Sequence, residues 1–248
     1  FDSRGVASNV APIQVADGVI FVEAGGRSVA AALLDGTVYL KWSVRSISDY
    51  HDQLIREPVH ICGPPAKNVT GDSYILITNT DGTIAALKYS ISLKEANTGF
   101  SLWETDGNFL GVASVFGQYF PIVDRDIAAS TLRYLEKFDS DIYLDCCKLP
   151  SGDPVAYPTL AYLIGKNAAF VDEFGYYGEF PVLAGGAVTD RPDVSETGQV
   201  GLNFTCEVSP WPAHDITSTR AGLFPIRCNM FMVAVINTRE FKVTANAH

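Results

Sequence analysis

Pairs of turn residues that contain glycine, set between apolar strands, constrain the fold of this chain more than any other feature. Strands rich in Val, Ile, Tyr, Phe and Ala occupy residues 18–42, 73–90 and 100–125. Asp-Gly and Gly-Gly pairs supply the positive φ angles that a tight hairpin between twisted strands requires. The chain is therefore predicted to be all-β, with antiparallel hairpins that turn at Gly25-Gly26, Asp35-Gly36, Asp81-Gly82 and Asp106-Gly107.

Length and composition are those of a folded protein. The 248 residues are enough for one large all-β domain or two smaller ones, and 47% of them are hydrophobic. No apolar run approaches the roughly 20 residues that a membrane-spanning helix needs, and residues 1–10 lack the features of a signal peptide. We therefore expect no membrane-spanning segment. Because the chain has no initiator Met and ends after a strand-like run, we also expect it to be part of a longer polypeptide.

The net charge of −10 bears on the partners of the chain. Affinity for nucleic acid comes largely from Lys and Arg side chains that neutralise phosphates, so specific DNA binding is disfavoured. An acidic surface suits a conduit through which DNA slides without adhering, and it equally serves solubility alone.

Soft and nucleophilic side chains form no recognisable site. The five cysteines contain no Cys-x-x-Cys pair and are odd in number, which favours reduced thiols over a disulfide framework. His51, His60 and Cys62 are close in sequence but match no zinc spacing. With four histidines and no Gly-x-Ser-x-Gly elbow, no Ser-His-Asp set can be singled out. We therefore predict no catalytic residues, no metal site and no cofactor.

Acidic and aromatic residues leave a second chemistry open. Two carboxylates that face each other across a cleft can hydrolyse a glycosidic bond, but their separation is set in three dimensions. Solvated acids at turns and strand edges are the alternative, and large aromatics in a β protein are more often core than sugar platform. The acidic candidates are Asp124, Asp126, Glu136, Asp172 and Glu173, and the aromatic candidates are Trp103 and Trp211.

Two segments carry helical periodicity. Apolar residues recur at helical spacing within residues 46–57, which predicts a short helix that stops at Pro58. Residues 126–138 also fit a helical stripe, although residues 131–134 can open a strand. The spacing of the first two Asp-Gly turns is close to the length of a four-stranded propeller blade, about 40 to 45 residues, whereas the third turn follows sooner.

A turn-rich stretch at residues 149–154 is the predicted boundary between two regions. Residues 1–150 are expected to form a propeller-like antiparallel β domain, and residues 151–248 a small β-barrel or sandwich. The further strands expected on either side of this boundary are residues 142–144, 160–164, 168–173, 179–183, 199–207 and 227–236.

Short motifs follow one another in a characteristic order. The first half contains DGVIFVEAGGR at residues 17–27, then SISDYHDQLI, TDGTIAALKY at 80–89, WETDG at 103–107 and LRYLEKF at 132–138. The second half contains YLIGK at 162–166, VLAGGAV at 182–188 and VGLNF at 200–204. This succession resembles that of the tail hub or nozzle (tail tubular) proteins of tailed bacteriophages, over essentially the whole chain.

The resemblance implies a function and a location. Members of that family are structural subunits of the virion that line or frame the DNA ejection channel of the tail. They form homo-oligomeric rings, usually sixfold, and they contact other tail, adaptor and fibre proteins while DNA passes without sequence-specific binding. The resemblance therefore implies that this chain is not an enzyme. It also implies that residues 131–138 form a strand, and we follow it there against the helical periodicity.

Two alternatives of another class stay open, namely a glycan-degrading and a glycan-binding domain of a phage tail tip. If the chain instead lines a channel, its acids should face the lumen, because a collar of carboxylates repels phosphates. The acids to examine first are Asp72, Asp153, Asp190, Asp193 and Glu196.

Overall fold

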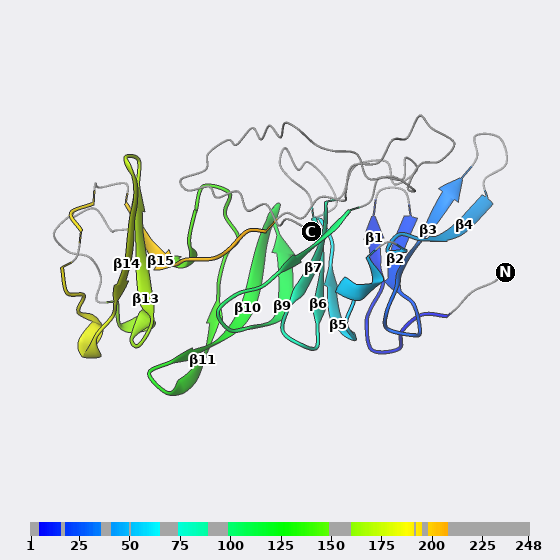
Figure 1. Ribbon diagram of the computed structural model, residues 1–248. Helices are drawn as coiled ribbons and strands as arrows, with labels where there is room; N and C mark the ends of the chain where they lie inside the picture. Colours follow the sequence, from blue (N-terminus) through cyan, green and yellow to red (C-terminus); the bar gives the residue numbers. More distant parts are fainter. Residues whose placement is uncertain are drawn as a thin grey trace, which may run out of the picture.

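The computed structural model is all-β, and its strands form four antiparallel sheets that follow one another in chain order (Figure 1). It describes residues 5–15, 18–35, 41–49, 51–64, 74–88, 99–148, 160–190, 192–194 and 198–207. The prediction of an antiparallel all-β protein is therefore confirmed. Among the described residues, no helix is long and apolar enough to cross a lipid bilayer.

The first two sheets are meanders, in which each strand pairs with the next one along the chain. Their strand orders are β1-β2-β3-β4 and β5-β6-β7-β8. Antiparallel neighbours need only short connections, so tight turns between apolar runs produce this order. The strands are β1 (Ile13–Val15), β2 (Gly18–Val22), β3 (Val29–Asp35), β4 (Lys41–Ser46), β5 (Pro58–Cys62), β6 (Tyr74–Asn79), β7 (Ile84–Lys88) and β8 (Phe100–Trp103).

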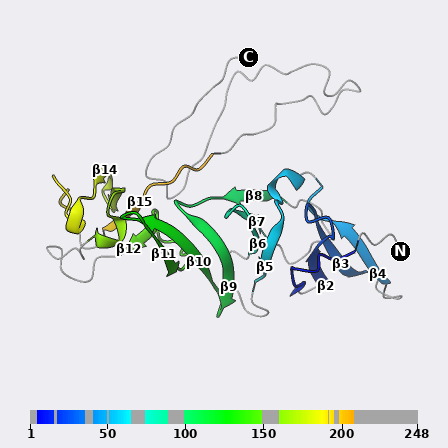
Figure 2. The same cartoon turned by 90° about the horizontal axis from the view of Figure 1, so that it is seen from below.

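The third and fourth sheets complete the array. The third has the order β11-β10-β9, whereas the fourth has the order β12-β15-β13-β14 and so brings its first and last strands together. Figure 2 shows β9, β10 and β11 between the second and fourth sheets. The strands are β9 (Asn108–Val115), β10 (Gln118–Ile127), β11 (Ser130–Leu135), β12 (Asp145–Lys148), β13 (Asn167–Asp172), β14 (Gly175–Pro181) and β15 (Gln199–Leu202).

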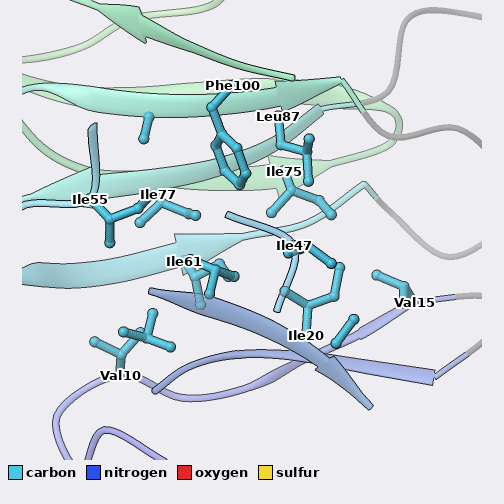
Figure 3. Close-up of a cluster of buried hydrophobic side chains, with 14 of the residues drawn as sticks. Val10, Val15, Ile20, Ile47, Ile55, Ile61, Ile75, Ile77, Leu87 and Phe100 are labelled. Carbon is cyan, nitrogen blue, oxygen red and sulfur yellow. The ribbon is translucent and has the colours of Figure 1, made fainter. Parts of the chain in front are cut away.

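The second sheet is buried on both faces. Alternation along β6 sends Ile75 and Ile77 into an apolar cluster shared with the first sheet, and Leu76 into a cluster shared with the third. Figure 3 shows the first of these clusters, where Ile20 of β2 and Ile75 of β6 point into the same interior. Burial on both faces explains why β6 and β7 are almost continuously apolar in sequence.

Glycine supplies the expected backbone conformation at two predicted hairpin turns. Gly26, between β2 and β3, has φ of 65°, and Gly82, between β6 and β7, has φ of 81°. Both turns are therefore confirmed, whereas Gly36 lies outside the described residues.

The Asp106-Gly107 pair is not a hairpin turn, which corrects the prediction. It connects β8 to β9, and these strands belong to different sheets. Gly107 does have a positive φ of 146°, and a Cβ atom there would lie 2.2 Å from the backbone oxygen of Asp124. Glycine is thus required here by the close approach of β10 rather than by a turn.

The hairpins of the third sheet turn at pairs that the sequence did not mark. Phe116 and Gly117 join β9 to β10 with φ of 49° and 79°, and Ala128 and Ala129 join β10 to β11 with φ of 49° and 64°. Positive φ at both central residues is the pattern of a type I′ turn, which normally uses Asn, Asp or Gly. Register along the flanking strands therefore overrides local turn preference at these two places.

The helix predicted within residues 46–57 is wrong, because only a single turn of 3-10 helix, η1 (Asp52–Leu54), forms there. The buried Ser48 hydroxyl accepts a hydrogen bond from the Val29 amide and donates one to Asp52. The segment therefore runs as a strand end and a tight turn that ties β4 to β3.

Helical periodicity was also misleading for residues 126–138. The strand that the resemblance implied at residues 131–138 is present over residues 130–135 as β11, which pairs along β10 from Ile127↔Ser130 to Ile122↔Leu135. Cross-strand pairing, invisible to a single-segment pattern, decides this conformation.

The second half agrees with the sequence in part. The strand predicted at 168–173 is present at residues 167–172, and the one predicted at 199–207 is present at residues 199–202 only. The strand predicted at 179–183 is present at residues 175–181. Residues 142–144 are not a strand, since β12 begins just after them, and residues 160–164 instead contain the 3-10 helix η2 (Leu160–Leu163). That turn is closed by a Lys166 amide that donates to the Leu163 carbonyl. A further 3-10 turn, η3, spans Ala184–Gly186.

Larger-scale predictions about architecture stay open. Residues 227–236, predicted as a strand, lie outside the described residues. Closure of the sheets into a propeller, a barrel in the second region and a boundary near residue 150 stay predictions. The apolar clusters of the described residues divide between Phe138 and Tyr143.

Candidate functional site

The most elaborate polar centre in the described part of the chain surrounds Arg125. Along β10, alternate residues point inward, and Arg125 takes an inward position after Tyr119, Pro121 and Val123. Its side chain is almost entirely buried, with 1% of the residue exposed. A buried guanidinium requires partners for its charge and for all five of its N–H groups.

Every N–H group of Arg125 has a partner. Its Nε and one Nη2 hydrogen donate to the two carboxylate oxygens of Glu136, at 2.6 and 2.7 Å. The remaining Nη2 hydrogen and Nη1 donate to Asp145 at 2.8 and 3.1 Å, and Nη1 also donates to the backbone oxygen of Asp106 at 3.0 Å. Bidentate pairing of this kind is the strongest and most directional contact that Arg makes with carboxylates.

These partners come from separate elements. Glu136 follows β11, Asp145 begins β12 of the fourth sheet, and Asp106 lies between β8 and β9. The Thr105 hydroxyl donates to Asp145 at 2.6 Å, and the Lys166 ammonium pairs with Asp106 at 2.9 Å. We call this set of six residues, including Arg125, the polar joint, because it links the third sheet to the fourth.

Electrostatics stabilise the charged forms within the polar joint. Burial alone raises the pKa of Asp145, but the hydrogen bonds and charge of Arg125 outweigh it and hold that pKa below its ordinary value. Burial lowers the pKa of Arg125, whereas its bonds to Glu136 and Asp145 raise it well above its ordinary value. A carboxylate held ionised in this way is suited to binding a cation and unsuited to donating a proton.

The five acids proposed for glycoside chemistry are not brought together. Asp124 pairs with Arg133 across β10 and β11 at 2.7 Å, and Asp126 accepts a hydrogen bond from Thr131 at 2.6 Å. Glu136 shares the Arg125 guanidinium with a second carboxylate, that of Asp145, and the guanidinium lies between the two.

The two remaining acids lie in the connection between β13 and β14. Asp172 accepts hydrogen bonds from the amides of Phe174 and Gly175 and from the Tyr177 hydroxyl, and Glu173 is exposed beside it. Asp172 therefore stabilises a hairpin turn.

Sequence reasoning missed Arg125 and Asp145. A signal for Arg125 was present, because a charged residue at an inward position of an alternating strand requires a buried partner. No comparable signal marked Asp145, which lies in a short, irregularly paired strand.

Trp103 belongs to an aromatic cluster at the end of the second sheet. Its ring makes edge contacts with Tyr74 and Phe138, at centroid distances of 5.2 and 5.4 Å. Its Nε1 donates to the Ser101 hydroxyl at 3.0 Å. Trp103 is therefore engaged in packing rather than presented as a flat sugar platform, and Trp211 lies outside the described residues.

Of the histidine and cysteine candidates, Cys62 is buried in the second sheet, whereas His60 lies at an exposed position of β5. His51 contacts the ring of Phe100 at a centroid distance of 6.0 Å. Burial lowers the pKa of His60 and raises that of Cys62 to about 11. Within the described residues, no group of three or more His, Cys, Asp or Glu side chains is arranged to hold a metal ion.

A pocket of about 460 Å³ lies where η1 meets the tips of the first two sheets. Two of its lining residues, Arg56 and Asp81, form an ion pair at 2.9 Å, and the exposed Arg27 also lines it. Its other lining residues are Asp52, Gln53, Ile55, Glu57 and Thr80. Acids and arginines are thus mixed, and the pocket favours neither an anionic nor a cationic ligand.

Two of the acids proposed to face a channel are described. Asp190 and Asp193 are exposed in the connection between η3 and β15. Asp72, Asp153 and Glu196 lie outside the described residues.

Comparison with known proteins adds no assignment. No protein-family model matches the chain, and no curated protein sequence matches it.

Proposed function

We propose that this chain is a structural subunit of a bacteriophage tail, in a nozzle or hub ring that lines or frames the DNA ejection channel. The observation that carries the proposal is the order of motifs from residue 17 to residue 204, which resembles that of the tail hub and nozzle family. In such an assembly the chain would be located in the virion and would contact further copies of itself and other tail, adaptor and fibre proteins.

The roles of the motif residues support a structural task. The Asp81-Gly82 motif forms a hairpin turn, in which the Asp81 carboxylate accepts hydrogen bonds from Thr83. Trp103 packs in an aromatic cluster, and Glu136 of the LRYLEKF motif holds the buried Arg125. Polar groups that are used in this way stabilise turns and the junction between sheets, which suits a structural subunit.

The proposal is tested on intact particles. Antibodies raised against this chain, bound to purified virions of the phage that encodes it, are expected to label the tail region in electron micrographs. A reconstruction of the tail should contain the chain as a ring around the channel. Absence of the chain from purified virions, or monomers scattered in the particle, would overturn the assignment.

The glycan-directed alternatives are tested with the same purified chain. A tail-tip glycosidase would release reducing ends from host surface polysaccharide, and a receptor module would bind that polysaccharide without cleaving it. Either result would replace the ring subunit as the preferred function.

A further inference from the structure

The first sheet has an apolar face that points away from the rest of the described core. Opposed residues of antiparallel strands share a face, and the register Val19↔Ala32↔Val44 and Leu34↔Trp42 places these residues opposite to the buried face. Trp42 and Val44 are 51% and 46% exposed. We name this the first-sheet patch: Val19, Ala32, Leu34, Trp42 and Val44.

Strands that are apolar on both faces are typical of a sheet covered on both sides. The second sheet is covered in this way, by the first sheet on one face and the third on the other. The first sheet has the same two-sided apolar pattern in β3, but only one of its faces is covered by another sheet of the described chain. The first-sheet patch is therefore suited to receive a further sheet.

A second apolar surface lies on the outer face of the third sheet. The register Ala113↔Phe120 and Gly111↔Ile122↔Leu135 places these residues opposite to the inward row that contains Val123 and Arg125. Leu135 is 72% exposed and Phe116, at the β9–β10 turn, is 99% exposed. We name this the third-sheet patch: Val115, Phe116, Phe120, Ile122 and Leu135.

Phe116 makes the third-sheet patch more than a chance exposure. A bulky residue with positive φ is a steric outlier, and a fully exposed Phe gains nothing from water. The register of β9 and β10 holds that conformation, so the exposed ring is a fixed feature of this surface. A contact that buries Phe116 would account for its position.

The charges beside the two patches are complementary. The third-sheet patch is followed along β10 by Asp124, paired with Arg133, and by Asp126, which has no cationic partner among the described residues. Exposed cations flank the first-sheet patch at both ends, Lys41 at the start of β4 and Arg27 beyond the end of β2. Whether the strands of the two patches run in the same or in opposite directions, the acidic end of the third-sheet patch would meet a cation beside the first-sheet patch.

We infer that copies of this chain associate head to tail, the first-sheet patch of one copy packing against the third-sheet patch of the next. A second copy offers the complement of both patches, because the acidic end of its third-sheet patch matches the cations beside the first-sheet patch. Each copy retains one free patch of each kind after pairing, so the contact is heterologous and closes into a ring when the rotation allows. The inference rests on the proposed function, because it supplies the subunit contacts of such a ring.

The test uses the purified chain and two patch variants, Val44→Glu and Leu135→Glu. By native mass spectrometry up to about 100 µM, where even a micromolar interface is populated, the unchanged chain is expected to form oligomers. Each variant alone is expected to be monomeric, because one patch is lost. Mixed together, the two variants should form a one-to-one dimer and nothing larger, since each retains the patch that the other lacks.

Several outcomes would overturn the inference. A monomeric unchanged chain, oligomers of either variant alone, or no dimer in the mixture would each do so. The control is Phe174→Ser, which removes an 80% exposed Phe outside both patches and should leave the oligomers unchanged. Melting temperatures show that each variant is folded, and Trp42→Ser replaces Val44→Glu if the latter is not.

A charge swap tests the pairing of the two patches. Asp126→Lys is expected to weaken association at least about tenfold at low salt, because it places like charges together. Adding Lys41→Glu or Arg27→Glu should restore it, and the one that does so identifies the direction of the strands. Rescue by neither would contradict the match between the patches.

The inference and the proposed function fail separately. Oligomers that follow the patch variants, formed by a chain that is absent from virions, would leave the interface standing and remove the tail assignment. A ring found in virions, together with patch variants that assemble as well as the unchanged chain, would remove the interface and leave the tail assignment standing.

Discussion

Replacement of Arg125 by Met is expected to destabilise this protein strongly. Met keeps most of the side-chain volume but removes a charge that Glu136 and Asp145 together neutralise. Breaking a buried ion pair by removing one partner costs about 3–5 kcal/mol, mainly because the remaining charge is left uncompensated. The side chains of Glu136 and Asp145 are 20% and 21% exposed, and Asp145 keeps its bond from Thr105, so a loss of about 3 kcal/mol is expected, at the lower end of that range.

The assay is urea unfolding, with the free energy and the denaturant slope fitted for each variant. Arg133→Met is the matched control, because Arg133 also pairs with a carboxylate across the third sheet but its side chain is 65% exposed. Exposed pairs contribute little, so this control should lose far less stability. Equal losses in the two variants would refute the reasoning that burial makes the Arg125 pairing decisive.

The same network predicts how stability depends on pH. The pKa of Asp145 is lowered in the folded protein, so its contribution is fully present above the unfolded value of about 3.9 and is lost as the pH falls through the folded value. The stability difference between the unchanged protein and Asp145→Asn should therefore be constant near neutral pH and shrink below about pH 4. A difference that grows on acidification would show that Asp145 is not held ionised by Arg125.

Three further outcomes are expected. Gly82→Val and Gly107→Val should each lower the free energy of unfolding by about 1 kcal/mol or more. The loss should be larger at Gly107, where the added carbon meets backbone rather than a side chain; melting temperatures equal to that of the unchanged protein would contradict this. At pH 8 a thiol reagent followed by peptide mass spectrometry should label exposed Cys206 well before Cys62, whose pKa burial raises to about 11. Arg45→Met should stabilise the protein by about 1 kcal/mol, because two buried guanidinium nitrogens of Arg45 have no hydrogen-bond partner among the described residues; a loss of stability would show that its charge is compensated.

Sequence patterns predicted the strands that belong to short, glycine-turned meanders. The Asp81-Gly82 turn and its two strands were predictable because all the interactions that define them are local. The prediction failed where the same dipeptide served another purpose, since Asp106-Gly107 leads from one sheet into the next. A turn dipeptide specifies a backbone conformation, and only the pairing of the flanking strands decides whether a hairpin results.

Turns without glycine were beyond the reach of local reasoning. Ala128 and Ala129 both adopt positive φ, which neither residue favours. Six consecutive residue pairs between β10 and β11 hold them in that conformation. Likewise, the helical spacing within residues 46–57 arises because Ile47 and Ile55 both enter the core from non-helical backbone.

Half of the candidate site could be predicted from the sequence. An Arg at an inward position of the alternating strand β10 indicates a buried ion pair, and Glu136 is near enough in sequence to be proposed as its partner. Asp145 comes from another sheet, so its part in the network depends on tertiary contacts that no spacing encodes.

The positions of the apolar clusters indicate a further role for the polar joint. Two apolar clusters hold the first three sheets together, whereas the clusters of the fourth sheet contain no described residue before Tyr143. The contacts described between the third and fourth sheets are therefore chiefly those of the polar joint. A region joined by few apolar contacts opens with a lower free energy than the core to which it is attached.

Hydrogen exchange of Arg125→Met should consequently be uneven. Amides of β13 and β15 in the fourth sheet are expected to exchange faster, because loss of the joint frees that sheet to open on its own. Amides of β6 and β7, buried between the first and third sheets, should keep exchange rates closer to those of the unchanged protein. Uniform acceleration across all four sheets would mean that they unfold as one unit and that the joint acts on global stability alone.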